Sequence, residues 1–136
     1  MKKELTLEAK IENIPQFIAL VDEYLESIDF SMKSQMQIDV ALDEILSNVA
    51  LYAYKEAPAI GNMSLVIEGD KEGPVVITIS DEGIHYNPLE AKDPDITASV
   101  EDRDIGGLGI FMTKKLMDNV EYNFKEGKNV LILTKA

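Results

Sequence analysis

A carboxylate and a carboxamide stand four residues apart in the segment 38–55, IDVALDEILSNVALYAYK. Apolar residues recur there with the period of a helix, so the segment predicts an amphipathic helix. Glu44 and Asn48, at i and i+4, then point the same way from the rim of its apolar face. Such a pair could supply a proton acceptor and a metal ligand. Alone, it is more common on a solvated face, so its meaning depends on the segments downstream.

A second candidate site follows the β-branched run of residues 75–80, where Asp81-Glu82-Gly83 ends a predicted strand. A carboxylate at the end of a buried strand can accept a hydrogen bond from the exocyclic amine of adenine. Gly83 would let the backbone approach the base and adopt dihedrals that a side chain forbids. By itself the triplet also fits an ordinary acidic turn.

The third candidate site is Gly106-Gly107-Leu108-Gly109, which opens a helix predicted to run to about Met117. A helix N-terminus carries positive partial charge, and a glycine-rich turn exposes backbone N–H groups to phosphate. The run is neither a Walker loop nor a dinucleotide-binding fingerprint, since GxxxxGK[ST] and GxGxxG are both absent. A glycine cluster before a helix also fits a simple cap.

Together these segments predict a nucleotide site. Mg²⁺ needs oxygen ligands and keeps several waters, so one carboxamide plus phosphate oxygens is enough. Asn48 would be that ligand. Glu44 would then lie near the γ-phosphate, where it could take a proton from an attacking hydroxyl or water.

Composition limits the function classes. The 136 residues are 46% apolar, which predicts one domain spanning 1–136. A net charge of −12, with Arg103 the only arginine, disfavours binding to nucleic acid or to anionic membranes. The chain has no cysteine and one histidine, which excludes disulfides and multi-histidine metal clusters. It also has no long apolar run and no apolar signal core, so we expect a cytoplasmic protein without a membrane segment.

The elements that must position these residues follow from local patterns. Strands are predicted at 3–10, 63–68, 75–80, 119–125 and 129–134, and helices at 14–27, from a Ser31 N-cap to 55, and at 106–117. Residues of about 84–106 show no long period and are predicted to form a lid, with a short helix possible near 96–101. Paired strands with grouped helices predict an α+β two-layer sandwich, a mainly antiparallel mixed sheet with helices on one face.

Four stretches in this order resemble the gyrase/histidine-kinase ATPase superfamily, whose nucleotide fold is named after Bergerat. They are ALDEILSNVALYAY, ISDEGIHYNPLE, DIGGLGIFMTKKLMDNVEY and KEGKNVLILTK. Within that superfamily the chain resembles the bacterial anti-sigma regulatory factors, the serine-protein kinases of partner-switching systems. The resemblance extends from the first predicted strand to Lys135.

The resemblance implies a role for each matching residue. It implies ATP and Mg²⁺ as cofactors, Glu44 as catalytic base and Asn48 as magnesium ligand. Asp81 would hold adenine and Gly83 would shape its pocket. The phosphate-binding residues would be Gly106, Gly107, Leu108 and Gly109.

The resemblance also implies partners. Family members phosphorylate a Ser or Thr of a small anti-anti-sigma antagonist and bind a sigma factor as the alternative partner. A homodimer is expected, partly because residues 3–10 look like a sheet edge that needs cover.

Two other function classes fit these residues less well. A nucleotide-gated binding module would use ATP only to select a partner, without phosphotransfer. Glu44 favours the kinase, because such a module needs no base. A free-standing sensor histidine kinase is disfavoured, because the chain has no room for a phosphoacceptor helix hairpin.

Overall fold

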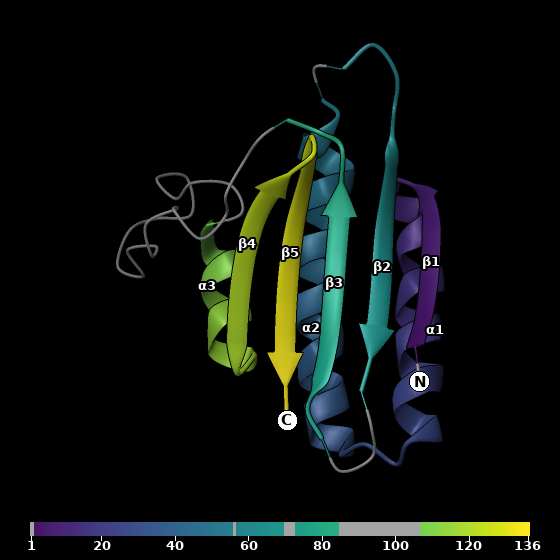
Figure 1. The fold of residues 1–136 in the computed structure, drawn as a ribbon, viewed down its shortest axis with the longest axis vertical. Helices are drawn as coiled ribbons and strands as arrows, with labels where there is room; N and C mark the ends of the chain where they lie inside the picture. Colours follow the sequence, from purple (N-terminus) through teal and green to yellow (C-terminus); the bar gives the residue numbers. More distant parts are fainter. Residues whose placement is uncertain (1, 56, 70–72, 85–106) are drawn as a thin grey trace.

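Alternating apolar side chains place one face of a five-stranded sheet against the helices (Figure 1). The computed structural model describes residues 2–55, 57–69, 73–84 and 107–136. The strands are β1 (Lys2–Glu8), β2 (Asn62–Glu68), β3 (Val75–Asp81), β4 (Asn119–Lys125) and β5 (Lys128–Lys135). The helices are η1 (Ile11–Asn13), α1 (Ile14–Ser27), α2 (Met32–Asn48), η2 (Val49–Ala53) and α3 (Gly107–Leu116).

The sheet has the strand order β1-β2-β3-β5-β4. Within the described residues every neighbouring pair is antiparallel, including Asp81 opposite Asn129 in the β3–β5 pair. The predicted α+β two-layer sandwich is therefore confirmed, although this sheet is purely antiparallel rather than mixed. The strand expected at residues 3–10 does form an edge, as β1.

The core lies between the sheet and the helices, which cover the same face of it (Figure 1). Side chains of β2 and β3 alternate between buried and partly exposed, as the two-residue period of a strand requires. The helices contribute buried residues that recur about once per helical turn. The fully buried large side chains include Phe17, Leu25, Ile38, Leu42, Leu46, Met63, Leu65, Ile67, Ile77 and Leu133. Burying each such side chain stabilises the fold by roughly 1.5–3 kcal/mol.

Local signals set most helix and hairpin ends. The Ser31 hydroxyl accepts a hydrogen bond from the Ser34 N–H at 3.3 Å, so Ser31 caps α2 as predicted. Asn13 precedes α1 but its side chain does not cap it, because its amide donates to the Glu8 carbonyl at 2.9 Å. At the β4–β5 turn, Glu126 and Gly127 both have positive φ, 54° and 79°, the backbone of a tight two-residue hairpin.

The helix expected over residues 38–55 differs in its last part. Regular α-helix ends at Asn48, and the wider π-helix η2 continues to Ala53. Apolar periodicity cannot distinguish these two windings over a single turn, so the prediction of one uniform helix was wrong there. Three sequence expectations lie outside the described residues: the tip of the β2–β3 hairpin, the lid beyond Ile84 and the short helix near 96–101.

Between α1 and α2, two carboxyl groups face each other. Burial, a hydrogen bond with Asp22 and the negative charges of Asp22 and Glu26 together raise the pKa of Asp39 from 3.8 to about 7. One oxygen of each carboxyl, Oδ1 of Asp22 and Oδ1 of Asp39, is buried with no hydrogen-bond partner in the described part of the chain. The contact therefore favours a proton held between the two groups.

In the part of the chain that the structure describes, no helix is both long and apolar enough to cross a membrane.

The pair of Asp22 and Asp39 makes stability depend on pH. Because the pKa of Asp39 rises from 3.8 to about 7 on folding, the native state holds a proton that the unfolded chain has lost between these values. The free energy of unfolding should therefore fall as pH rises from about 4 to 7. Asp39→Asn should flatten this fall and make the protein more stable than the parent at pH 8. Urea unfolding from pH 5 to 8.5 tests this, with exposed Glu23→Gln on α1 as control. A steeper fall in Asp39→Asn than in the parent would contradict it.

Candidate functional site

Segments that are far apart in the sequence meet at one end of the molecule, the upper end in Figure 1. The C-terminal end of α2, the C-terminal end of β3 and the start of α3 all lie there. α3 packs against α2, and the Ile84 N–H donates to the Ala53 carbonyl at 3.0 Å, which joins the end of β3 to the end of η2. The three predicted site segments are thus brought to the same end.

Asp81 is the last residue of β3 and is only 8% exposed. Its Oδ1 accepts two hydrogen bonds, from the Gly83 N–H at 2.8 Å and from Asn129 Nδ2 at 3.0 Å. Within the described residues no group donates to its Oδ2. Burial raises the pKa of Asp81 above the ordinary 3.8, and the hydrogen bonds from Asn129 and Gly83 lower it. The site therefore presents a buried carboxyl group with one oxygen held by two donors and the other without a donor among the described residues.

Gly83 allows the strand end to pass close to η2. A Cβ at this position would lie 2.3 Å from the Ala53 carbonyl oxygen and 2.6 Å from the Ala53 Cβ. Real Cβ atoms do not approach backbone that closely, so only glycine fits unless the two segments separate. Gly83 therefore permits a close approach between the strand end and the backbone at the end of η2, while the expected approach to a base stays a prediction.

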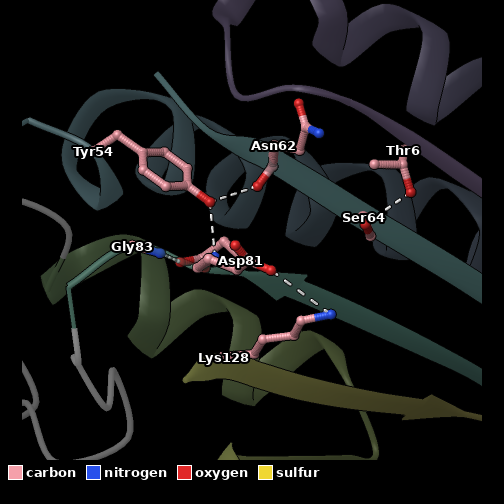
Figure 2. A network of polar contacts seen from close by, with 8 residues as sticks. Thr6, Tyr54, Asn62, Ser64, Asp81, Gly83 and Lys128 are labelled. Carbon is pink, nitrogen blue, oxygen red and sulfur yellow. Dashed lines mark hydrogen bonds and ion pairs between the residues drawn. The ribbon is translucent and has the colours of Figure 1, made fainter. Parts of the chain in front are cut away.

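Tyr54 stabilises the same junction with two hydrogen bonds from its hydroxyl group (Figure 2). Its hydroxyl donates to the Asn62 carbonyl at 2.6 Å and accepts from the Glu82 N–H at 2.7 Å. Burial raises the pKa of Tyr54 above its usual 10.0, so it remains a neutral donor. The tyrosine belongs to the stretch that carries the family resemblance, but reasoning from residue chemistry did not select it.

Glu44 and Asn48 are both partly buried on α2, with Asn48 at its last residue where η2 begins. Neither side chain makes a hydrogen bond or ion pair with the part of the chain that the structure describes. No group of three or more His, Cys, Asp or Glu residues able to hold a metal occurs in that part either. This donor set fits a cation that takes most of its ligands from phosphate and water, as Mg²⁺ does.

The glycine-rich segment is only partly described. α3 begins at Gly107, so the backbones of Gly107, Leu108 and Gly109 form its first turn, while Gly106 lies outside the described residues. The first N–H groups of a helix have no acceptor within the helix. They are suited to bind an anion at this end of the molecule.

Two further residues of the site, Asn129 and Tyr122, were not identified from the sequence. Asn129 on β5 is 8% exposed and its Nδ2 donates to Asp81 and, at 2.8 Å, to the Ile84 carbonyl. Its Oδ1 accepts from the Tyr122 hydroxyl at 2.5 Å. A signal was available, because Asn129 stands in phase with the inward-facing Leu131 and Leu133, where a polar residue is unusual.

Nearby, Lys128 and Glu82 form a 3.9 Å ion pair. It is exposed to solvent and therefore contributes little to stability.

Comparisons with known proteins agree with this arrangement. The family model described as a histidine kinase-like ATPase domain matches residues 7–135. The chain is 26% identical over 134 residues to the anti-sigma F factor of Clostridium acetobutylicum, covering 98% of this chain and 92% of that protein. It is also 26% identical over 140 residues to the serine-protein kinase RsbW of Bacillus mycoides, covering 97% and 86%.

The fold has a counterpart among solved structures. The crystal structure of the RsbU and RsbW domains of Rv1364c from Mycobacterium tuberculosis superposes with a TM-score of 0.70 at 18% identity. The match covers 99% of this chain and 32% of that longer protein. At this identity the likeness concerns the fold.

The close approach at Gly83 can be tested by adding one methyl group. Gly83→Ala should push β3 away from η2 and lose the Ile84–Ala53 hydrogen bond, lowering the free energy of unfolding by about 1–3 kcal/mol. Gly73→Ala is the matched control, because a Cβ there meets nothing within 4 Å. Urea unfolding and amide exchange at Ile84 would measure both effects. Equal stability of the two variants would mean that the junction does not depend on this contact.

Proposed function

The chain belongs to the histidine kinase-like ATPase domain family, and on that premise we propose that it is an ATP-dependent protein serine/threonine kinase of the anti-sigma factor type. The observation that carries the proposal is that the end of β3, which bears Asp81, is held against η2, the helix that continues from Asn48. The close approach at Gly83 and Ala53 and the hydrogen bond from Glu82 to Tyr54 make this connection. This junction would hold Asp81, the proposed adenine-binding carboxylate, in place relative to a helix whose polar rim has no partner in the described residues. A nucleotide bound across it would have its base and its phosphates oriented by one rigid unit.

Adenine binding is assigned to Asp81. Its Oδ2 would accept a hydrogen bond from the 6-amino group, while Oδ1 remains held by Gly83 and Asn129. A charge-assisted hydrogen bond of this kind is stronger than a neutral one. Gly83 would let the base lie against the backbone. The backbone N–H groups of Gly106, Gly107, Leu108 and Gly109 would receive the phosphates at the start of α3.

Phosphoryl transfer is assigned to the rim of α2. Asn48 would hold Mg²⁺ together with phosphate oxygens, and the ion would neutralise charge on the phosphates. Glu44, one turn earlier, would accept the proton of the attacking Ser or Thr hydroxyl. Within the described residues no ion pair neutralises Glu44, so its carboxylate is available as a base.

The protein substrate is inferred from the named relatives. One of them is an anti-sigma factor and another a serine-protein kinase. We therefore propose that this chain phosphorylates a small anti-anti-sigma antagonist and binds a sigma factor as its alternative partner. A net charge of −12 agrees with partners that are proteins rather than nucleic acid.

The roles of Glu44 and Asn48 predict different failures. Asn48→Ala should weaken Mg²⁺-dependent ATP binding and abolish transfer together. Glu44→Ala should bind ATP nearly as the parent does and transfer phosphate about 10²–10⁴-fold more slowly. Calorimetry and labelled-ATP transfer to the antagonist protein would measure both, with exposed Asp43→Ala on the same helix as control. Transfer by Glu44→Ala at the parent rate would remove Glu44 as the base. Tight ATP binding by the parent with neither transfer nor hydrolysis would favour a nucleotide-gated binding module.

Self-association is also proposed, and β1 motivates it. Among the strands that the structure describes, β1 pairs with β2 alone, so its other edge has no partner strand there. We expect a homodimer mass in light scattering at tens of micromolar protein. A monomer mass under these conditions would contradict the expectation.

A further inference from the structure

Three side chains from three strands form a hydrogen-bonded chain that ends at Asp81. The Tyr122 hydroxyl on β4 donates to Asn129 Oδ1 at 2.5 Å, and Asn129 Nδ2 on β5 donates to Asp81 Oδ1 at 3.0 Å. Asn129 and Asp81 lie directly opposite each other in the β3–β5 pairing. Asp81 and Asn129 are both 8% exposed and Tyr122 is partly buried, so most of the hydrogen-bonded chain is shielded from solvent.

The orientation of the Asn129 amide follows from its partners. Its NH₂ group faces two acceptors, the Asp81 carboxylate and the Ile84 carbonyl, the latter at 2.8 Å. A flipped amide would turn Oδ1 toward both acceptors and repel them. The Tyr122 hydroxyl stabilises the observed orientation, because it donates to Oδ1 from the opposite side.

This orientation acts on the charge state of Asp81. Burial favours the neutral acid and raises the pKa of Asp81, whereas the Asn129 and Gly83 donors favour the carboxylate and lower it. The other ionisable groups described around it are Tyr54, Glu82, which Lys128 pairs at 3.9 Å, and Tyr122. None of these offers Asp81 a direct ion pair, so the Asn129 amide is the main side-chain contact that opposes protonation.

We propose that Asn129, oriented by Tyr122, is a positioning residue that keeps Asp81 a hydrogen-bond acceptor and thereby sets the preference for adenine over guanine nucleotides. The inference rests on the proposed function, since it assumes that Asp81 contacts the base. An ionised Asp81 accepts from the 6-amino group of adenine. Guanine carries an acceptor oxygen at that position, which only a protonated Asp81 could satisfy.

The test measures binding of MgATP and MgGTP by calorimetry from about pH 4, close to the ordinary pKa of an aspartate, to about pH 8.5. In the parent, ATP affinity should fall as the pH drops through the pKa of Asp81, because protonation removes the acceptor. Asn129→Leu keeps the number and branching of the side-chain heavy atoms but removes the donor. It should move the midpoint of this fall to higher pH and lower the ATP/GTP affinity ratio at pH 7 about tenfold or more. Tyr122→Phe should act in the same direction by about two- to tenfold.

Tyr24→Phe is the matched control. It also removes a part-buried tyrosine hydroxyl, in this case one that donates to the Gly69 carbonyl at 2.7 Å, at the end of the β2–β3 pair that lies away from Asp81. It should lower stability without moving the pH midpoint or the ATP/GTP ratio. A purely structural role for Tyr122 would make Tyr122→Phe behave like Tyr24→Phe, and that result would overturn the proposal.

Asp81→Asn separates this inference from the proposed function. If Asp81→Asn binds ATP as tightly as the parent at every pH, the adenine site is wrong and both are overturned. If Asp81→Asn loses ATP binding but folded Asn129→Leu keeps the parent midpoint and ratio, only the positioning role is overturned. Should Asn129→Leu fail to fold, Tyr122→Phe decides by the same two readouts.

Discussion

The contact on which the rest of the site depends is the hydrogen bond from the Ile84 N–H to the Ala53 carbonyl, made at the end of β3 and the end of η2. Carbonyls in the last turn of a helix have no partner within the helix, so this one is available to the strand. The approach is possible only because Gly83 has no Cβ, which would lie 2.3 Å from the same oxygen. The backbone of the sheet and the backbone of the helix are thereby held together at the candidate nucleotide site.

The π-helix gives that contact its geometry. A wider turn directly after Asn48 changes the direction of the residues that follow, so that the Tyr54 hydroxyl reaches both the Asn62 carbonyl and the Glu82 N–H. Single π turns are found at functional sites because they re-aim side chains without ending the helix. Here the turn separates α2, which carries Glu44 and Asn48, from Ala53 and Tyr54, which form hydrogen bonds with the residues just after β3.

The carboxyl groups of Asp81 and Asp39 have neighbours of opposite kinds. Asp81 is buried and receives two donors on one oxygen, which lower its pKa and offset the effect of burial in part. Asp39 is partly buried and meets a second carboxyl, Asp22, and its burial and that contact raise its pKa to about 7. The neighbours act in opposite directions, because a donor stabilises the charged form and another acid stabilises the neutral form.

The sequence alone determined the features that depend on neighbours along the chain. Strand and helix periods, the Ser31 cap, the Glu126-Gly127 turn and the i, i+4 placement of Glu44 and Asn48 are all local, and the structure has them. The family motifs, taken in their order along the chain, likewise predicted the fold. Only the tertiary structure decided the π turn, the Tyr54 clamp and the Tyr122–Asn129 chain. Tyr54 meets Glu82 across 28 residues and Asn129 meets Asp81 across 48, and no periodic pattern encodes which distant polar groups will satisfy each other once both are buried.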